Sequence, residues 1–193
     1  MSARATFAIV DSRVRAEHRT VAYACAAAAV VGFVAPHGLP GPVFFCSLLG
    51  IVIALVQGPG RFPHLDLCEQ SAPLFGRQVA RAKALVPCVI ATLAMLAYVA
   101  AASVAGLRNS ATVLAVTLAA TVPSTLTALS ATIRKGPSRL LYVVMAAGVS
   151  AIAFALAAIA GSVPGALGFA VLASFLALRQ YGETLARYDP VRD

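Results

Sequence analysis

The sequence predicts an all-α integral membrane protein with six transmembrane helices, on the basis of three observations. Of the 193 residues, 60% are hydrophobic and only 11% are charged, whereas a soluble domain has about 25% charged residues. Six apolar stretches contain no charged residue and no histidine, and each approaches the length of about 20 residues that a helix needs to cross a bilayer. The charged residues fall between these stretches and are shared unevenly among the connections.

The six apolar stretches are expected to be helices, because a backbone in lipid must satisfy its hydrogen bonds within the chain. The stretches are Thr20–Pro36, Pro42–Gln57, Leu85–Leu107, Ala111–Ile133, Leu140–Ala160 and Pro164–Leu178. The first, second and sixth stretches are short for a full crossing. Flanking residues could extend them, the bilayer could thin around them, or the first two could be partly re-entrant.

The basic residues predict the orientation of the helices. Fourteen of the 15 Lys and Arg residues lie before the first stretch, in alternate connections or after the last stretch, and Arg108 alone lies on the opposite side. The positive-inside rule then places both termini in the cytoplasm, and we expect the cell (inner) membrane as the location. The net charge of +8 therefore indicates membrane orientation, and we expect no nucleic-acid partner.

This topology divides the chain into five parts. The parts are an N-terminal interfacial segment at 1–19, spans one and two at 20–57, a cytoplasmic loop at 58–84, spans three to six at 85–178, and a cytoplasmic tail at 179–193.

The first stretch is expected to be a signal anchor and not a cleaved signal peptide, because the charged segment before it is long and contains Asp11 and Glu17.

No motif in the chain predicts catalysis. The sequence contains no P-loop, no G-x-S-x-G and no H-E-x-x-H. All seven acidic residues lie outside the apolar stretches, which argues against a proton-coupled transporter. His64 and Cys68 are four residues apart, but a metal site needs three or four ligands. We therefore expect no catalytic residue, no metal and no cofactor.

Hydroxyl side chains gather in the fourth span. Thr117, Thr121, Ser124 and Thr125 share one helix face, with Pro123 close to the middle of the stretch. Small and hydroxyl residues allow helices in a membrane to approach closely and to hydrogen-bond across their interface. Two interpretations are open: the four residues could serve helix packing, or they could line a transport pathway.

The loop at 58–84 is the longest connection and carries an amphipathic pattern. Ser71 can cap a helix with Pro73 in its first turn. Apolar residues then lie on one side and Arg77 and Arg81 on the other, with Lys83 at the entrance to span three. This pattern predicts a short basic helix at the cytoplasmic interface, which could simply lie on the lipid headgroups. A second amphipathic helix is predicted before span one.

The loop resembles the coupling region of six-span ABC-transporter permeases of the exporter class. Glu69, Pro73 and Lys83 match the acid, proline and lysine of that region, and Arg77 and Arg81 lie between them. The resemblance implies a permease without its own ATPase. A separate cytoplasmic ATP-binding subunit would dock on residues 58–84, and a second, identical or related, permease subunit would complete the transporter.

Two other functions are compatible with the residues. A non-catalytic membrane scaffold or assembly subunit would also have spans rich in small residues and no catalytic groups. A membrane enzyme has the weakest support, because no paired acids and no nucleophile–base set are present.

Overall fold

The structure is a computed structural model that describes residues 3–34, 38–57, 76–134, 137–159 and 161–187. All regular elements in these ranges are helical. They are α1 (Ala3–Ala16), α2 (His18–Val34), α3 (Pro40–Val56), α5 (Gly76–Val104), α6 (Ser110–Leu129), the 3-10 helix η1 (Ser130–Ile133), α7 (Pro137–Ala158) and α8 (Val163–Arg187). The prediction of an all-helical chain is confirmed for the described residues.

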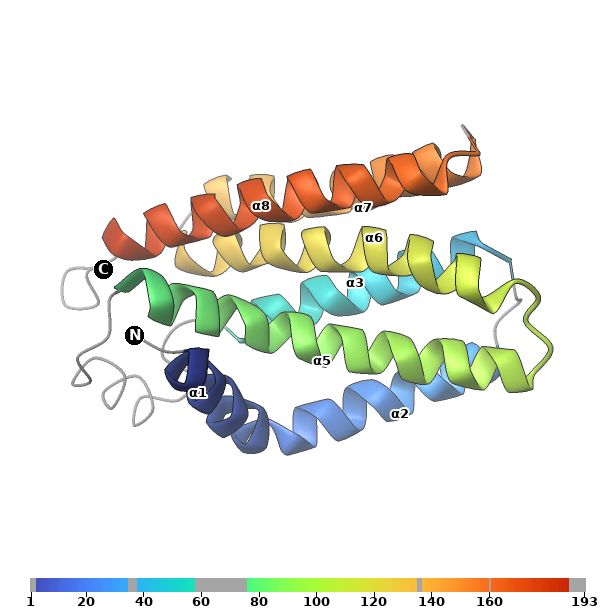
Figure 1. Cartoon of the computed structure of the whole chain (residues 1–193), viewed down its shortest axis with the longest axis horizontal. Helices are drawn as coiled ribbons and strands as arrows, with labels where there is room; N and C mark the ends of the chain where they lie inside the picture. Colours follow the sequence, from blue (N-terminus) through green and yellow to red (C-terminus); the bar gives the residue numbers. More distant parts are fainter. Residues whose placement is uncertain (1–2, 35–37, 58–75, 135–136, 160, 188–193) are drawn as a thin grey trace.

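The six helices from α2 to α8 run along a common long axis and form a bundle (Figure 1). Each contains most of one predicted apolar stretch. By length and composition, four of them could cross a membrane: Ala82–Val104, Ser110–Ile133, Pro137–Ala158 and Val163–Leu185. The remaining two, α2 and α3, have 17 residues each. At 1.5 Å per residue they measure about 26 Å, less than the hydrocarbon thickness of about 30 Å.

Helices α7 and α8 lie together on one side of the bundle, and α6 lies between this pair and α5 (Figure 1). Helix α2 packs mainly on α5 and barely meets α3, its neighbour in the sequence. Helix α1 and the C-terminal end of α8 lie at the same end of the bundle. The connections that hold all the basic residues except Arg108 begin or end there, so the bundle has one basic end and one nearly uncharged end.

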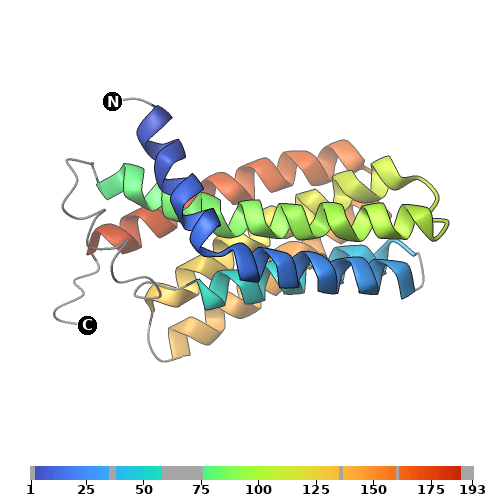
Figure 2. The same ribbon diagram turned by 90° about the horizontal axis from the view of Figure 1, so that it is seen from below.

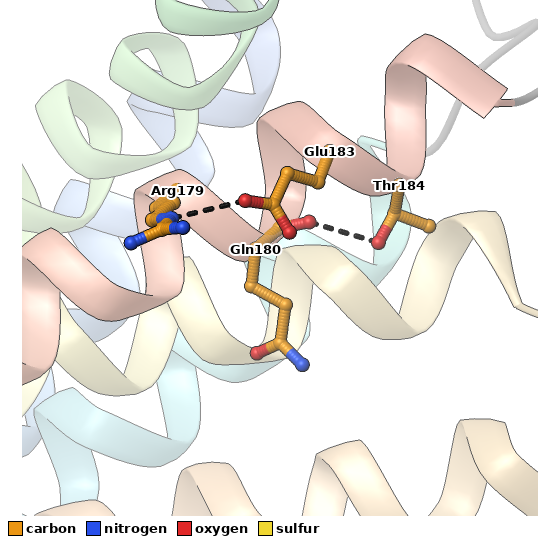
Figure 3. Close-up of polar contacts among 4 residues, drawn as sticks. All are labelled: Arg179, Gln180, Glu183 and Thr184. Atoms are coloured by element: carbon orange, nitrogen blue, oxygen red, sulfur yellow. Dashed lines mark hydrogen bonds and ion pairs between the residues drawn. The ribbon is translucent and has the colours of Figure 1, made fainter.

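The helix that contains the predicted sixth span does not end at Leu178, the predicted start of the tail. Helix α8 continues to Arg187. Arg179 pairs with Glu183 at 2.9 Å, and the Thr184 hydroxyl donates to the Gln180 carbonyl at 2.8 Å (Figure 3). The helix continues because Tyr181 and Leu185 still pack against the core, and the exposed ion pair adds a few tenths of a kcal/mol.

The predicted short helix between spans two and three can be followed only from Gly76 onward. Residues 58–75 lie outside the described residues. From Gly76 onward, the chain forms the first turns of α5 and runs without interruption into span three. No glycine or proline falls between Arg77 and Lys83, so nothing in the sequence breaks the helix before the membrane.

Helix α1 matches the amphipathic helix predicted before span one. It crosses α5 near the basic end of the bundle (Figure 2). Val10 and Val14 pack against the core, while Asp11 and Arg15 form an exposed ion pair at 2.9 Å. The chain turns into α2 at Glu17, whose carboxylate accepts a hydrogen bond from the Thr20 hydroxyl at 2.5 Å. A helix with one apolar face and one charged face is suited to lie at a membrane interface.

Small residues set the distance between α2 and α5. Ala24, Ala28 and Gly32 lie on one face of α2 and are buried. A Cβ atom added to Gly32 would overlap the backbone carbonyl of Tyr98. Because Tyr98 is buried in the core and its carbonyl belongs to a helix, the backbone has no room to move aside. The glycine is therefore required by the close approach of two helices.

We expect Gly32→Ala to lower the stability of the detergent-solubilised protein by about 1–3 kcal/mol, the usual cost of overpacking. Gly148 on α7 provides a matched control, because a Cβ added there meets nothing within 4 Å. Gly148→Ala should leave the thermal unfolding midpoint unchanged or raise it slightly, since alanine favours helix. Equal midpoints for the two variants would contradict the close approach of α2 to α5.

Candidate functional site

Helix α6 is the central element of the bundle. Within an apolar 18-residue section of its span 72% of the residues are buried, against 17% for the corresponding section of α8. It contacts α3, α5, α7 and α8. The four hydroxyl residues predicted from the sequence are almost fully enclosed, with exposures of 0–1% for Thr117, Thr121, Ser124 and Thr125. The structure therefore places them in helix contacts, which is the geometry that the packing interpretation requires.

One close contact of these residues is with α3. A Cβ atom added to Gly50 would overlap the Thr125 hydroxyl and lie 3.2 Å from Cγ2 of Thr121. The two helices run in the same direction, both starting at the nearly uncharged end (Figure 1). Ser47 lies one turn before Gly50 on α3, and Thr117 lies one turn before Thr121 on α6. These five residues, Ser47, Gly50, Thr117, Thr121 and Thr125, form what we call the α3–α6 seam.

The hydroxyl groups of the seam fall into two kinds. Thr125 Oγ1 donates to the Thr121 carbonyl at 2.7 Å, and Ser124 Oγ beside the seam donates to the Ala120 carbonyl at 2.7 Å. Within the described residues, the hydroxyls of Ser47, Thr117 and Thr121 are buried and form no hydrogen bond. A buried hydroxyl without a partner costs about 1–3 kcal/mol. The seam is therefore a polar strip within an apolar bundle whose hydrogen-bonding capacity is only partly used.

The predicted partner-coupling residues lie elsewhere. Glu69 and Pro73 fall outside the described residues. Arg77, Arg81 and Lys83 belong to the first turns of α5, at the basic end of the bundle, and Lys83 is half-buried. The three basic residues therefore lie on one helix, α5, whereas the seam is formed by α3 and α6.

The start of α5 joins the rest of the bundle directly after these basic residues. Ala84 and Cys88 pack in one cluster with Leu129 of α6 and with Ala177 and Tyr181 of α8. The basic segment is therefore attached to the ends of two other helices. Any force on this segment would reach α6 and α8 as well as α5.

Two residues of the seam were missed by the sequence analysis. Gly50 and Ser47 lie in an apolar stretch that carried no polar motif. Their signal was the spacing of small residues on one face of α3, Ser47, Gly50 and Ala54, which is typical of close helix contacts in membranes. The hydroxyl face of α6 could be identified from the sequence because four hydroxyl residues lie on it. The sequence did not indicate that α3 packs against this face.

Comparison of the chain with protein-family models, with curated proteins and with solved structures gives no match.

We expect Gly50→Ala to destabilise the protein by about 1–3 kcal/mol, because the new methyl group overlaps the Thr125 hydroxyl. Thr125→Ala removes the overlapping atom, so Gly50→Ala should cost less in that background. Thr125→Val keeps the branched shape and removes the hydrogen bond to Thr121, so the full cost of Gly50→Ala should remain. Unfolding midpoints of the six proteins provide the measurement. Equal costs in the Ala and Val backgrounds would contradict the proposed contact.

Proposed function

We propose that this chain is a membrane-spanning permease subunit of an ATP-driven exporter. A separate cytoplasmic nucleotide-binding subunit would dock on residues 58–84 and supply the energy. The proposal places both termini in the cytoplasm and all six helices across the cell (inner) membrane. The bundle with one basic end supports this orientation, because the basic end would face the cytoplasm.

The continuity of the basic segment with α5 is the observation that carries the proposal. Residues 76–83 and the third span form a single helix, which packs against α2, α3 and α6. A helix transmits motion along its axis, since each turn is hydrogen-bonded to the next, and in α5 one such bond is missing at Pro87. A subunit that moved the basic end would therefore tilt α5 and shift the helices that rest on it, without a separate coupling element.

Transport would also require the interior of the bundle to open. The α3–α6 seam, with Ser124 beside it, supports this step as the polar strip along which a substrate could pass, which is the pathway expected for Thr117, Thr121, Ser124 and Thr125. Because these residues are enclosed in the described conformation, α3 and α6 would have to separate, or a second permease subunit would have to frame the path with them. Unpaired hydroxyls favour such an opening, since separation would let them bind water or substrate.

A non-catalytic membrane scaffold is the second candidate. The observation that favours it is the complete burial of the seam, since tight helix packing is all that a scaffold needs. The two candidates differ in their partners: a permease requires an ATPase, and a scaffold does not.

Charge reversal at the start of α5 tests the proposal. We expect Arg77→Glu/Arg81→Glu to abolish co-purification of an ATPase with the tagged protein from membranes, because the docking surface changes sign, while the amount of protein in the membrane fraction stays the same. Arg19→Glu/Arg139→Glu is the matched control: it makes the same change of net charge at the same end of the bundle, at two exposed residues outside the loop.

Wild-type and control proteins should both retain the ATPase. An ATPase that still co-purifies with the Arg77/Arg81 variant would refute the docking assignment. If wild-type protein purifies with no ATPase, the scaffold is the better account.

A further inference from the structure

A polar cluster joins three helices at the basic end of the bundle. Arg134 follows η1, Tyr142 lies on α7, and Gln180 and Thr184 lie on α8. The Arg134 guanidinium carbon is 4.3 Å from the centre of the Tyr142 ring, and Nη2 of Arg134 donates to the Thr184 hydroxyl at 3.4 Å. Gln180 Nε2 donates to the Tyr142 hydroxyl. We call these four residues the Arg134 cluster.

The cluster holds the Arg134 guanidinium group in position but supplies no negative charge to neutralise it. Its three other side chains are uncharged, and Arg134 has no carboxylate partner among the described residues. Arg134 Nε is buried and forms no hydrogen bond within them. Glu183, on the same section of α8, is already paired with Arg179 at 2.9 Å (Figure 3). A half-buried cation without a counter-ion is costly, so the cluster is suited to bind an anion.

The guanidinium group is also preorganised for one class of anion. Stacking on Tyr142 and the bond to Thr184 hold its plane in position. A planar guanidinium presents several N–H donors in a fixed fork, which matches the oxygen atoms of a phosphate or carboxylate group. The carbonyl oxygen of an amide or the hydroxyl of a sugar would leave the charge unmatched.

The surroundings indicate where the anion comes from. Met145, three residues after Tyr142 on α7, and Leu176, four residues before Gln180 on α8, are exposed and lie on the same helix faces as the cluster. Arg139, one turn before Tyr142, is exposed as well. An apolar surface that borders a basic group at the end of a membrane-spanning helix has the two halves needed for a lipid: one for acyl chains and one for a charged headgroup.

We propose that the Arg134 cluster binds the phosphate group of an anionic phospholipid, whose acyl chains lie against the exposed apolar side chains of α7 and α8 beside the cluster. The bound lipid would neutralise Arg134 and tie η1, α7 and α8 together. This site is independent of the transport function, because it uses none of the residues at 58–84 and none of the α3–α6 seam.

Native mass spectrometry of the purified protein in a neutral detergent tests the proposal. Phosphatidylglycerol and phosphatidylcholine are titrated in parallel into wild type, Arg134→Gln, Arg134→Lys and the control Arg108→Gln, whose arginine lies at the opposite end. We expect Arg134→Gln to weaken phosphatidylglycerol binding about tenfold, the loss of one charge-assisted hydrogen bond. Arg134→Lys should weaken it by less, since the ammonium keeps the charge but loses the fork. Arg108→Gln should match wild type.

Each outcome decides the matter. Wild-type affinity for phosphatidylglycerol in both Arg134 variants would overturn the proposal, and if Arg134→Gln does not fold, Arg134→Lys alone decides. Equal binding of phosphatidylcholine and phosphatidylglycerol by wild type would also overturn it, because no anionic selectivity would remain. A final titration with inorganic phosphate separates the two sources of the anion: phosphate that displaces the lipid at equal concentration would overturn the lipid assignment in favour of a soluble phosphate.

Discussion

The close approach of α3 to α6 at Gly50 is the constraint on which the rest of the bundle depends. A helix in lipid gains little from burying apolar surface against another helix, so packing at short range has to hold the structure together. Gly50 allows Thr121 and Thr125 to lie directly against the α3 backbone. This contact fixes α6 at the centre, where α5, α7 and α8 can all reach it. Gly32 of α2 likewise allows a close approach at the edge of the bundle, since it lets α2 pack against the backbone of Tyr98 on α5.

The polar groups inside the bundle differ from those at its basic end. Inside the bundle they are small and neutral, and several of their hydroxyls are left without partners in the described residues. At the basic end they include the charged Arg134, which connects η1 with Tyr142 of α7 and with the end of α8. The interior therefore has spare hydrogen-bonding capacity, and the basic end has spare positive charge. The first suits a path or an adaptable packing surface, and the second suits anionic partners.

The sequence predicted the six helices well, because apolar stretches of this length have few alternatives in a membrane. It did not predict how far the helices continue beyond the uncharged stretches: α8 runs past Leu178 and α5 starts before Leu85, because helical hydrogen bonding continues into segments that contain charged residues. It identified the hydroxyl face of α6 because Thr117, Thr121, Ser124 and Thr125 repeat at helical spacing. It could not find the Arg134 cluster, because Arg134 and Thr184 are 50 residues apart and only the packing of three helices brings them together.

A disulfide cross-link between α3 and α6 tests the central contact most directly. An ideal Cβ at Gly50 lies 3.6 Å from the Cβ of Thr125, within the range of about 3.5–4.5 Å found in disulfides. In a background with the four native cysteines replaced by alanine, Gly50→Cys/Thr125→Cys should oxidise in membranes and lose reactivity toward maleimide under denaturing conditions. Gly50→Cys/Gly168→Cys, with its second cysteine on the exposed face of α8, should keep both thiols. Two free thiols in the Gly50/Thr125 pair after oxidation would contradict the account.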